Sequence, residues 1–244
     1  MNIPKEAFAQ IDHRPWPLPE RPWALQQRWS DLLFLHWEIE AEALRHLIPA
    51  ALEIDLFDGT AWIAVVPFSM QGVAPRGCPQ PSFLCDFPEI NVRTYVKRHD
   101  RPGVWFFSLD VPNQLPVWIA HALFHLPYFK AEMDVANGPD GTRYQSRSRN
   151  RAFKARYRGG SRFEPRADSF ERWATERYCL YSASSAGRIY RAHVQHPIWP
   201  LQQADLEIQE NTMLHDFPIG PSHPSVLFAK RLSVVAWMPE KLSE

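Results

Sequence analysis

The sequence predicts an α+β domain in which β-strands predominate. Its 244 residues include 23 prolines, 10 tryptophans and 15 phenylalanines, a composition that favours many short strands joined by proline turns over a helical bundle. Several stretches alternate apolar and polar side chains with the period of two that is typical of half-buried strands. A chain of this length buries most of its apolar surface without a disulfide or a structural metal.

The elements before residue 89 follow from local signals. In chain order we expect a strand at 25–39, a short helix at 40–48, a hairpin of strands at 52–57 and 60–70, and a long loop at 71–88. The helix has acidic side chains in its first turn and ends at Pro49. Asp58 and Gly59 favour a hairpin turn. The loop has prolines and glycines without periodicity, which is typical of functional loops in compact domains.

The elements after residue 96 are mostly strands. In chain order we expect a turn at 101–103, a strand at 104–111, a helix from Asn113 or Pro116 to Phe124, a strand at 126–135, two strands within 142–158 that end at Gly159 and Gly160, a helix at 168–173, a hairpin of strands at 176–182 and 188–195, and a closing strand at 227–237. Turn residues and N-cap signals set these boundaries.

The first 24 residues differ in composition from the rest. They contain Pro4, Pro15, Pro17, Pro19 and Pro22. Prolines at this density disfavour both helix and central strand, so we expect residues 1–24 to be an extended arm that wraps the surface or a partner subunit. No linker divides residues 25–244, which we expect to form one domain. The arm and the aromatic content favour a homo-oligomer.

Charge and cysteine usage limit the partners. Lysine and arginine together number 27, and aspartate and glutamate also number 27, so no excess charge favours nucleic acid or an anionic membrane. Cys78, Cys85 and Cys179 are too scattered for a disulfide framework. No apolar run approaches the ~20 residues of a membrane-spanning helix, and the N-terminus lacks a secretory signal. We expect a cytoplasmic protein that uses no cofactor and binds a small molecule.

The central stretch is the predicted strand at 89–96, because its two faces are chemically opposite. One face carries Ile90, Val92, Thr94 and Val96, and the other carries Glu89, Asn91, Arg93 and Tyr95. If the second face lines a cavity, it brings a carboxylate, an amide, a guanidinium and a phenol into one pocket. If it faces solvent, it has no functional meaning.

Four segments in this order carry a resemblance to a known family. They are residues 87–96 (FPEINVRTYV), 126–128 (LPY), 175–181 (TERYCLY) and 196–201 (HPIWPL). Together they resemble the YqjF-like family of uncharacterised bacterial proteins, which is similar in fold to acetoacetate decarboxylase. The resemblance implies a curved sheet that closes into a cone-shaped barrel around an internal pocket.

The resemblance also implies site residues. In acetoacetate decarboxylase a lysine forms a Schiff base with a β-keto acid, and a carboxylate lies on a nearby strand. Lys130 and Glu89 stand at about the corresponding positions. The second lysine of the decarboxylase is absent, because Phe129 precedes Lys130 and Ala131 follows it.

Each candidate has an alternative. Lys130 is either a nucleophile with a pKa lowered by burial or a surface lysine paired with an acid. Glu89 is either a general base or the ion-pair partner of Arg93, and Arg93 either clamps a substrate carboxylate or only holds Glu89. The tyrosines Tyr128, Tyr178 and Tyr181 are either ligand contacts or buried side chains with satisfied hydroxyls.

Two histidines raise the question of a metal. His121 and His125 have the i,i+4 spacing that lets two imidazoles meet one metal on a helix. No third ligand is near in sequence, so packing is the favoured interpretation and we expect no metal site.

The function expected from these residues is lyase-like, decarboxylase-type chemistry on a small keto acid or related carbonyl compound. Lys130 and Glu89 would be catalytic, and Arg93, Tyr128, Tyr178 and Tyr181 would bind the substrate. The alternative is a non-catalytic domain that binds or senses a small carbonyl or carboxylate ligand in the same cavity.

Overall fold

A computed structural model describes residues 2–112 and 124–243 of the chain. In this part, fourteen strands form one continuous sheet. The strands are β1 (Leu25–Ile39), β2 (Glu53–Ile54), β3 (Ala61–Pro75), β4 (Phe87–Arg98), β5 (Arg101–Val111), β6 (Tyr128–Lys130), β7 (Glu132–Gly138), β8 (Gly141–Ser148), β9 (Arg151–Arg162), β10 (Cys179–Ala183), β11 (Ile189–Gln195), β12 (Leu201–Asn211), β13 (Ser225–Ala236) and β14 (Glu240–Lys241). The helices are α1 (Ile3–Ala7), α2 (Ala41–Arg45), α3 (Ser82–Cys85) and α5 (Phe170–Thr175).

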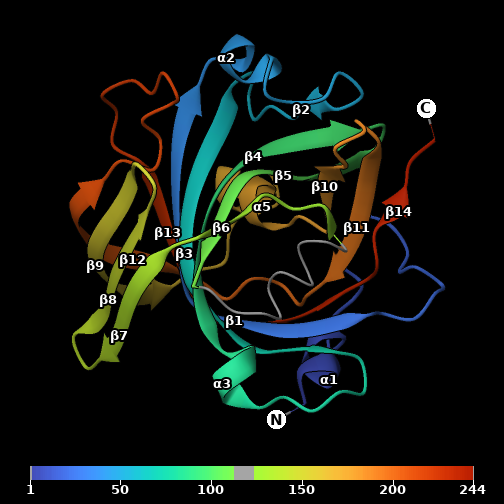
Figure 1. The fold of residues 1–244 in the computed structure, drawn as a ribbon, viewed down its shortest axis with the longest axis horizontal. Coiled ribbons are helices and arrows are strands. Elements are labelled where there is room, and N and C mark those ends of the chain that lie inside the picture. Colours follow the sequence, from blue (N-terminus) through green and yellow to red (C-terminus); the bar gives the residue numbers. More distant parts are fainter. Residues whose placement is uncertain (1, 113–123, 244) are drawn as a thin grey trace.

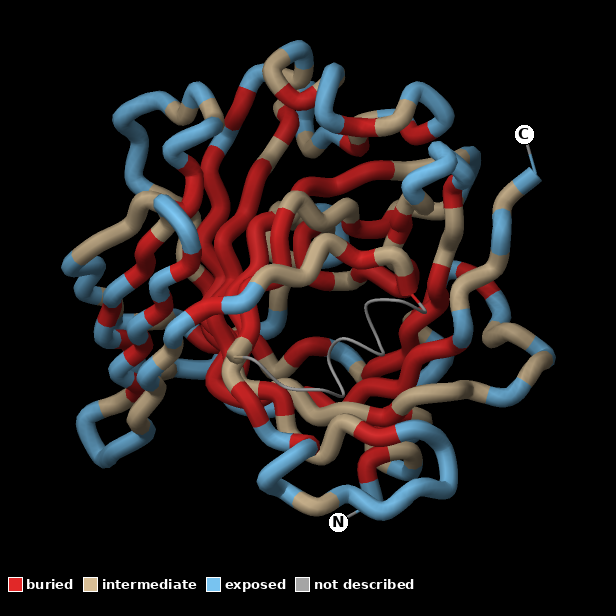
Figure 2. Tube along the Cα trace, in the orientation of Figure 1, coloured by how far each residue is buried: buried red, intermediate tan, exposed pale blue. Residues whose placement is uncertain are grey.

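Part of the sheet closes on itself. The strand order runs β11-β10-β5-β4-β3-β1-β13, and an additional pairing of β11 with β13 joins the two ends. This ring is antiparallel except between β5 and β10 (Figure 1). Figure 2 shows that the ring strands are buried along most of their length, whereas the turns between strands are largely exposed. The predicted strand-rich fold is therefore confirmed, with its curved sheet closed as a ring.

Four strands continue the sheet beyond the ring as a wing, in the order β12-β9-β8-β7 (Figure 1). Side chains of β3 show how the two parts share the core. Val65 belongs to a cluster that includes Tyr144 and Phe153 of the wing, whereas Val66 belongs to the cluster with Trp199 inside the ring. Because β3 is buried on both faces, it reads in the sequence as a nearly continuous apolar run.

The N-terminal arm packs closely against the ring. It begins with α1, where the Asn2 side chain caps the first turn and Pro4 occupies a position that tolerates proline, so these residues are helical rather than extended. Further along, Arg14 and Trp16 are buried. Arg14 Nη1 donates a hydrogen bond to the Val194 carbonyl of β11 at 2.6 Å.

Helix α5 lies against the inner side of the ring strands. Its N-cap is Ser169, whose hydroxyl accepts a hydrogen bond from the Arg172 backbone N–H. The Phe170 ring lies 4.1 Å from that of Trp62 on β3, and the Trp173 ring lies 4.6 Å from that of Tyr95 on β4. The helix therefore closes the inner space of the ring at the end of β4 that carries Arg93 and Tyr95.

Several expected elements differ from the structure. The hairpin of 52–57 with 60–70 is limited to its closing pair, an antiparallel bridge of Phe57 with Thr60 around the expected turn, because β1 and β4 occupy both edges of β3. Strand β2 pairs with β4, beyond the end of the pairing of β4 with β3. The loop expected at 71–88 is shorter, since β3 continues to Pro75 and α3 follows.

Glycines account for two further differences. The turn expected at 101–103 lies at His99 and Asp100. Gly103 belongs to β5, where a Cβ atom would come within 2.6 Å of the Cys179 carbonyl oxygen, so glycine permits the approach of β10. Strand β9 likewise continues past Gly159, and Gly159 pairs with Ala204 of β12. Strand β12 itself was not anticipated.

Two expectations concern other parts of the chain. The helix expected from residue 113 to Phe124 lies outside the described residues except for its last position. Within the described residues, no helix combines the length and the apolar character that crossing a membrane requires.

Candidate functional site

The ring encloses a cavity of about 130 Å³. Its walls are mainly aromatic and aliphatic side chains from β1, β3, β4, β5 and the segments around β10. A smaller set of polar residues also lines it, namely Gln27, Glu89, Asn91, Arg93, Tyr128, Thr175, Arg177 and His196. An apolar cavity with a few converging polar groups is the usual form of a small-molecule site.

The polar face of β4 turns inward. Glu89, Asn91 and Arg93 all line the cavity, and the alternating residues Ile90 and Val92 join the core on the other face. The strand alternation thus places a carboxylate, an amide and a guanidinium in one file along a single wall. Tyr95, the fourth residue of this face, is fully buried and makes a 2.6 Å hydrogen bond with His36 Nε2.

Glu89 has an unusual electrostatic environment. Its side chain is 1 % exposed, and burial, with a smaller contribution from Asp110, raises its pKa to about 8 although Asn91, Tyr128 and Arg93 act in the opposite direction. Asn91 Nδ2 donates to Glu89 Oε1 at 3.2 Å. The Glu89 carboxyl is therefore mostly protonated at neutral pH, as expected when burial outweighs the stabilisation of the charged form.

Arg93 is a cation without a carboxylate partner. No described carboxylate oxygen lies within 4.0 Å of its guanidinium, so it forms no ion pair with Glu89. Its Cζ lies 5.4 Å from the Phe34 ring centroid and 5.9 Å from the Tyr95 ring centroid. Its Nε is buried and has no hydrogen-bond partner in the described part of the chain. The guanidinium is thus held by aromatic rings and keeps its hydrogen-bond donors for another group.

A second arginine, Arg177, also lies close to the Tyr95 ring. Arg177 Cζ is 4.9 Å from that ring centroid and 4.3 Å from that of Trp173. Its Nη1 donates to Asp55 Oδ2 at 2.5 Å, and its Nε donates to the Trp173 carbonyl at 2.7 Å. Nη2 is buried without a hydrogen-bond partner among the described residues. Asp55 balances the charge of Arg177, so among the described residues Arg93 is the arginine of the cavity lining that has no carboxylate partner.

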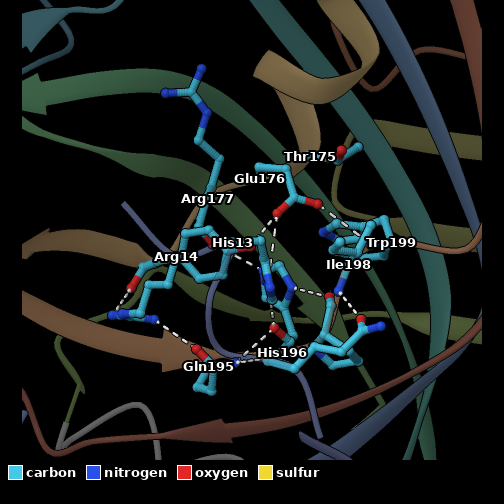
Figure 3. Close-up of polar contacts among 12 residues, drawn as sticks. His13, Arg14, Thr175, Glu176, Arg177, Gln195, His196, Ile198 and Trp199 are labelled. Atoms are coloured by element: carbon cyan, nitrogen blue, oxygen red, sulfur yellow. Dashed lines mark hydrogen bonds and ion pairs between the residues drawn. The ribbon is translucent and has the colours of Figure 1, made fainter. Parts of the chain in front are cut away.

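Tyr178 does not line the cavity and contacts a polar cluster that shares His196 with the lining. Its hydroxyl donates to Glu176 Oε2, and its ring stacks on His196 with 4.6 Å between centroids. His13 of the arm approaches the His196 carbonyl oxygen at 3.2 Å. Figure 3 shows this cluster, with the Arg177 guanidinium pointing away from it. These contacts join the arm to β10 and β11, so Tyr178 serves packing here.

The structure does not bring Lys130 or Tyr181 to the cavity. The Lys130 side chain is exposed at the end of β6, and the Tyr181 hydroxyl donates to the Arg101 carbonyl at 2.7 Å. The lysines of the chain are Lys5, Lys97, Lys130, Lys154, Lys230 and Lys241. None of them lines the cavity, and all belong to the described part. Of the six expected site residues, Glu89, Arg93 and Tyr128 meet there.

Sequence reasoning missed several cavity residues. Arg177, His196 and Trp199 all contribute to the lining. The alternation of residues 176–182 indicated two faces but not which one pointed inward. His196 has both ring nitrogens near carbonyl oxygens, Nδ1 at 2.8 Å from Pro197 and Nε2 at 3.3 Å from Arg177, and the sequence carries no signal for that arrangement.

The histidine pair is only partly described. His121 lies outside the described residues, and the His125 ring packs against Tyr190 with 4.6 Å between centroids. Within residues 2–112 and 124–243, no three His, Cys, Asp or Glu side chains are grouped in a way that would hold a metal ion.

Solved structures with the same fold include enzymes. The enduracididine biosynthesis enzyme MppR, complexed with pyruvate, matches with a TM-score of 0.64 at 12% identity over 95% of this chain and 93% of that one. Acetoacetate decarboxylase from Legionella pneumophila matches with a TM-score of 0.64 at 11% identity over the same shares. At these identities the likeness establishes the fold alone.

The sequence itself has nearer relatives. Protein YqjF of Bacillus subtilis (strain 168), described as uncharacterized, is 38% identical over 232 residues, which are 93% of this chain and 96% of YqjF. The model of the family DUF2071, described as "Uncharacterized conserved protein", matches residues 26–233. The resemblance to YqjF-like proteins is therefore confirmed, and the chain belongs to the DUF2071 family, on a fold shared with acetoacetate decarboxylase-like proteins.

Proposed function

We propose that the cavity binds a small carboxylate-bearing molecule and that Arg93 is its anchor. The observation that carries this proposal is the Arg93 guanidinium, which lines an apolar cavity without a carboxylate partner among the described residues. Arg93 is half-buried and its Nε is buried without a hydrogen-bond partner among the described residues; an unpaired charge in such a place is costly, and an anionic ligand lowers that cost. The planar fork of arginine also matches a carboxylate with two parallel hydrogen bonds.

Glu89 complements this anchor. A protonated Glu89 adds no negative charge to the cavity at neutral pH, so it does not repel an anion, and its O–H is a hydrogen-bond donor for a ligand oxygen. A carboxylate bound nearby would disfavour ionisation of Glu89 further. The enzyme MppR, which has the same fold, has a solved structure in complex with pyruvate. That complex supports the proposal that the ligand carries a carboxylate.

The proposed site does not use an imine. Schiff-base formation needs an uncharged amine next to the substrate carbonyl. No lysine lines the cavity, and Lys130 is exposed. We therefore assign ligand binding to Arg93 and Glu89 and give Lys130 no part in it.

A second candidate function, lyase-type proton transfer, is favoured by the pKa of Glu89. A value of about 8 lies near neutral pH, where a general acid–base is most effective. In the proposed step the fraction of Glu89 that is ionised at neutral pH accepts a proton from the carbon next to the ligand carbonyl. The C–H electron pair becomes an enolate, and the reverse step returns the proton. Loss of CO2 is less suited to this site, because a guanidinium stabilises the carboxylate charge that decarboxylation removes.

Isothermal titration calorimetry with acetate, propionate, pyruvate and acetoacetate tests the binding proposal. Hydrogen bonds to charged groups contribute about 1.5–3 kcal/mol, so Arg93→Ala should weaken binding of these acids by roughly 10- to 100-fold. Arg93→Lys should restore part of the affinity. Arg143→Ala, which removes an exposed arginine on β8 outside the ring, is the matched control. Equal affinities of the wild-type and Arg93→Ala proteins would refute the anchor.

Deuterium exchange tests the second candidate. Pyruvate incubated with the protein in D2O should lose its methyl proton signal in NMR faster than without protein. Glu89→Gln should abolish the acceleration, and Lys130→Met should leave it unchanged. Acceleration that persists in Glu89→Gln would exclude Glu89 as the base.

A further inference from the structure

Three polar groups of the cavity share one wall. On β4, Glu89, Asn91 and Arg93 alternate inward, and the residues that pair with the first two on β3 are apolar: Phe68 opposite Glu89 and Val66 opposite Asn91. Leu109 of β5 pairs with Asn91 on its other side. A ligand in contact with this file of polar groups therefore meets apolar side chains on both flanks.

Toward the end of the cavity away from Arg93, three neighbouring strands contribute apolar side chains, and Gln27 of β1 contributes a polar one. Phe87 of β4 pairs with Met70 of β3, which pairs with Trp29 of β1, and all three line the cavity. A strand rises about 3.3 Å per residue, so Phe87 and Arg93 lie roughly 20 Å apart along β4. Val73 of β3 also contributes to this end. The walls thus extend well beyond the reach of a two- or three-carbon acid held at Arg93.

We propose that the ligand carries an apolar body next to its carboxylate, an alkyl chain of about four to eight carbons or an aromatic ring. This inference rests on the proposed function, since it takes Arg93 as the anchor of the carboxylate. The apolar body lies against β1, β3 and β5 and extends toward Phe87. A cavity of about 130 Å³ is close to the roughly 150 Å³ in which an apolar engineered cavity holds benzene.

We expect an apolar body because it costs free energy to leave such apolar walls in contact with water. Each buried methylene contributes about 0.8 kcal/mol, which is about a fourfold gain in affinity. A short polar acid uses Arg93 but leaves the flanking side chains of Val66, Phe68 and Leu109 without contact. A longer acid covers those side chains and keeps its head group at Arg93. Affinity should therefore rise with chain length along a series of simple acids.

The test measures dissociation constants for acetate, butanoate, hexanoate, phenylacetate and the uncharged analogue hexanamide. Hexanoate should bind roughly 100-fold more tightly than acetate, from four added methylenes at up to about fourfold each. Hexanamide should bind at least about tenfold more weakly than hexanoate, because it lacks the charge-assisted hydrogen bonds.

A variant of the apolar wall adds an independent readout. Val66 lines the cavity opposite Asn91, and Val66→Phe should remove about tenfold of the hexanoate affinity while acetate binding changes less than about threefold. Ile208→Phe, at an exposed position of β12 outside the cavity, is the matched control and should leave both affinities unchanged.

The outcomes separate the two proposals. Equal affinities for acetate and hexanoate, both lost in Arg93→Ala, would overturn the apolar body and leave the carboxylate site in place. Equal affinities for hexanoate and hexanamide would overturn the carboxylate site and leave an apolar cavity. A gain with chain length that Arg93→Ala reduces for every acid supports both.

Discussion

The buried carboxyl of Glu89 makes the stability of the protein depend on pH in a way that one substitution isolates. Glu89 is 1 % exposed, and its pKa rises from 4.5 to about 8 in the folded state. Because the folded state binds the proton more tightly, the contribution of Glu89 is fully present below pH 4.5 and is lost as the pH rises through 8. A rise of about 3.5 pH units at about 1.4 kcal/mol per unit gives a loss of up to about 5 kcal/mol.

The variant Glu89→Gln replaces the carboxyl group with an amide of similar size, which does not titrate. Its free energy of unfolding should be close to that of the wild-type protein near pH 5 and should exceed it increasingly toward pH 8.5. Other groups with shifted pKa values, such as Asp110 at about 6, are present in both proteins and cancel to first order in the difference.

Urea unfolding followed by tryptophan fluorescence measures this difference at several pH values from 5 to 9. We expect the difference to grow by several kcal/mol over that range, in the direction of a more stable variant at high pH. A difference that stays constant within about 1 kcal/mol would show that the folded-state pKa of Glu89 is ordinary, and the assignment of a neutral Glu89 to the cavity would be refuted.

Three further predictions concern residues around the cavity. Asp55→Ala leaves the buried Arg177 charge unpaired and should lower the free energy of unfolding by about 3–5 kcal/mol. Asp205→Ala breaks an exposed ion pair and should lower it by less than about 1 kcal/mol. Denaturant titration measures both free energies. Ser169→Ala removes the N-cap of α5 and should lower the melting temperature through a loss of about 1 kcal/mol. Lys130→Met should change neither stability nor carboxylate affinity by more than about 0.5 kcal/mol, because the side chain is exposed; a tenfold loss of affinity in calorimetry would return Lys130 to the site.

The alternation of β4 could be predicted because strand geometry alone fixes it. Once Ile90 and Val92 belong to one face, Glu89, Asn91 and Arg93 must share the other. Both faces of β4 are buried because the sheet closes as a ring and the core continues to the wing. The local sequence indicates neither the ring nor the wing. The sequence therefore identified which side chains lie together on β4, and the tertiary structure decided that their face is the inner one.

The positions of Lys130, Tyr178 and Tyr181 depended on information that the sequence does not carry. Lys130 ends a strand of three residues, too short for its alternation to fix a direction. On the segment that leads into β10, Arg177, Cys179 and Leu180 line the cavity. Leu180 pairs with Val104, which also lines it, and the alternation along the strand therefore turns Tyr181 the other way. The face to which each β10 side chain points is set by the parallel pairing of β10 with β5, which is a contact between residues far apart in the chain.

A crystal structure of the protein with 6-bromohexanoate would locate both ends of the ligand, since the bromine is identified by its anomalous scattering. We predict both carboxylate oxygens within hydrogen-bond distance of the Arg93 guanidinium and the bromine in contact with Phe68 or Leu109, which flank the polar file of β4. A ligand bound only on the outer surface, or one with its carboxylate remote from Arg93, would contradict the proposed site.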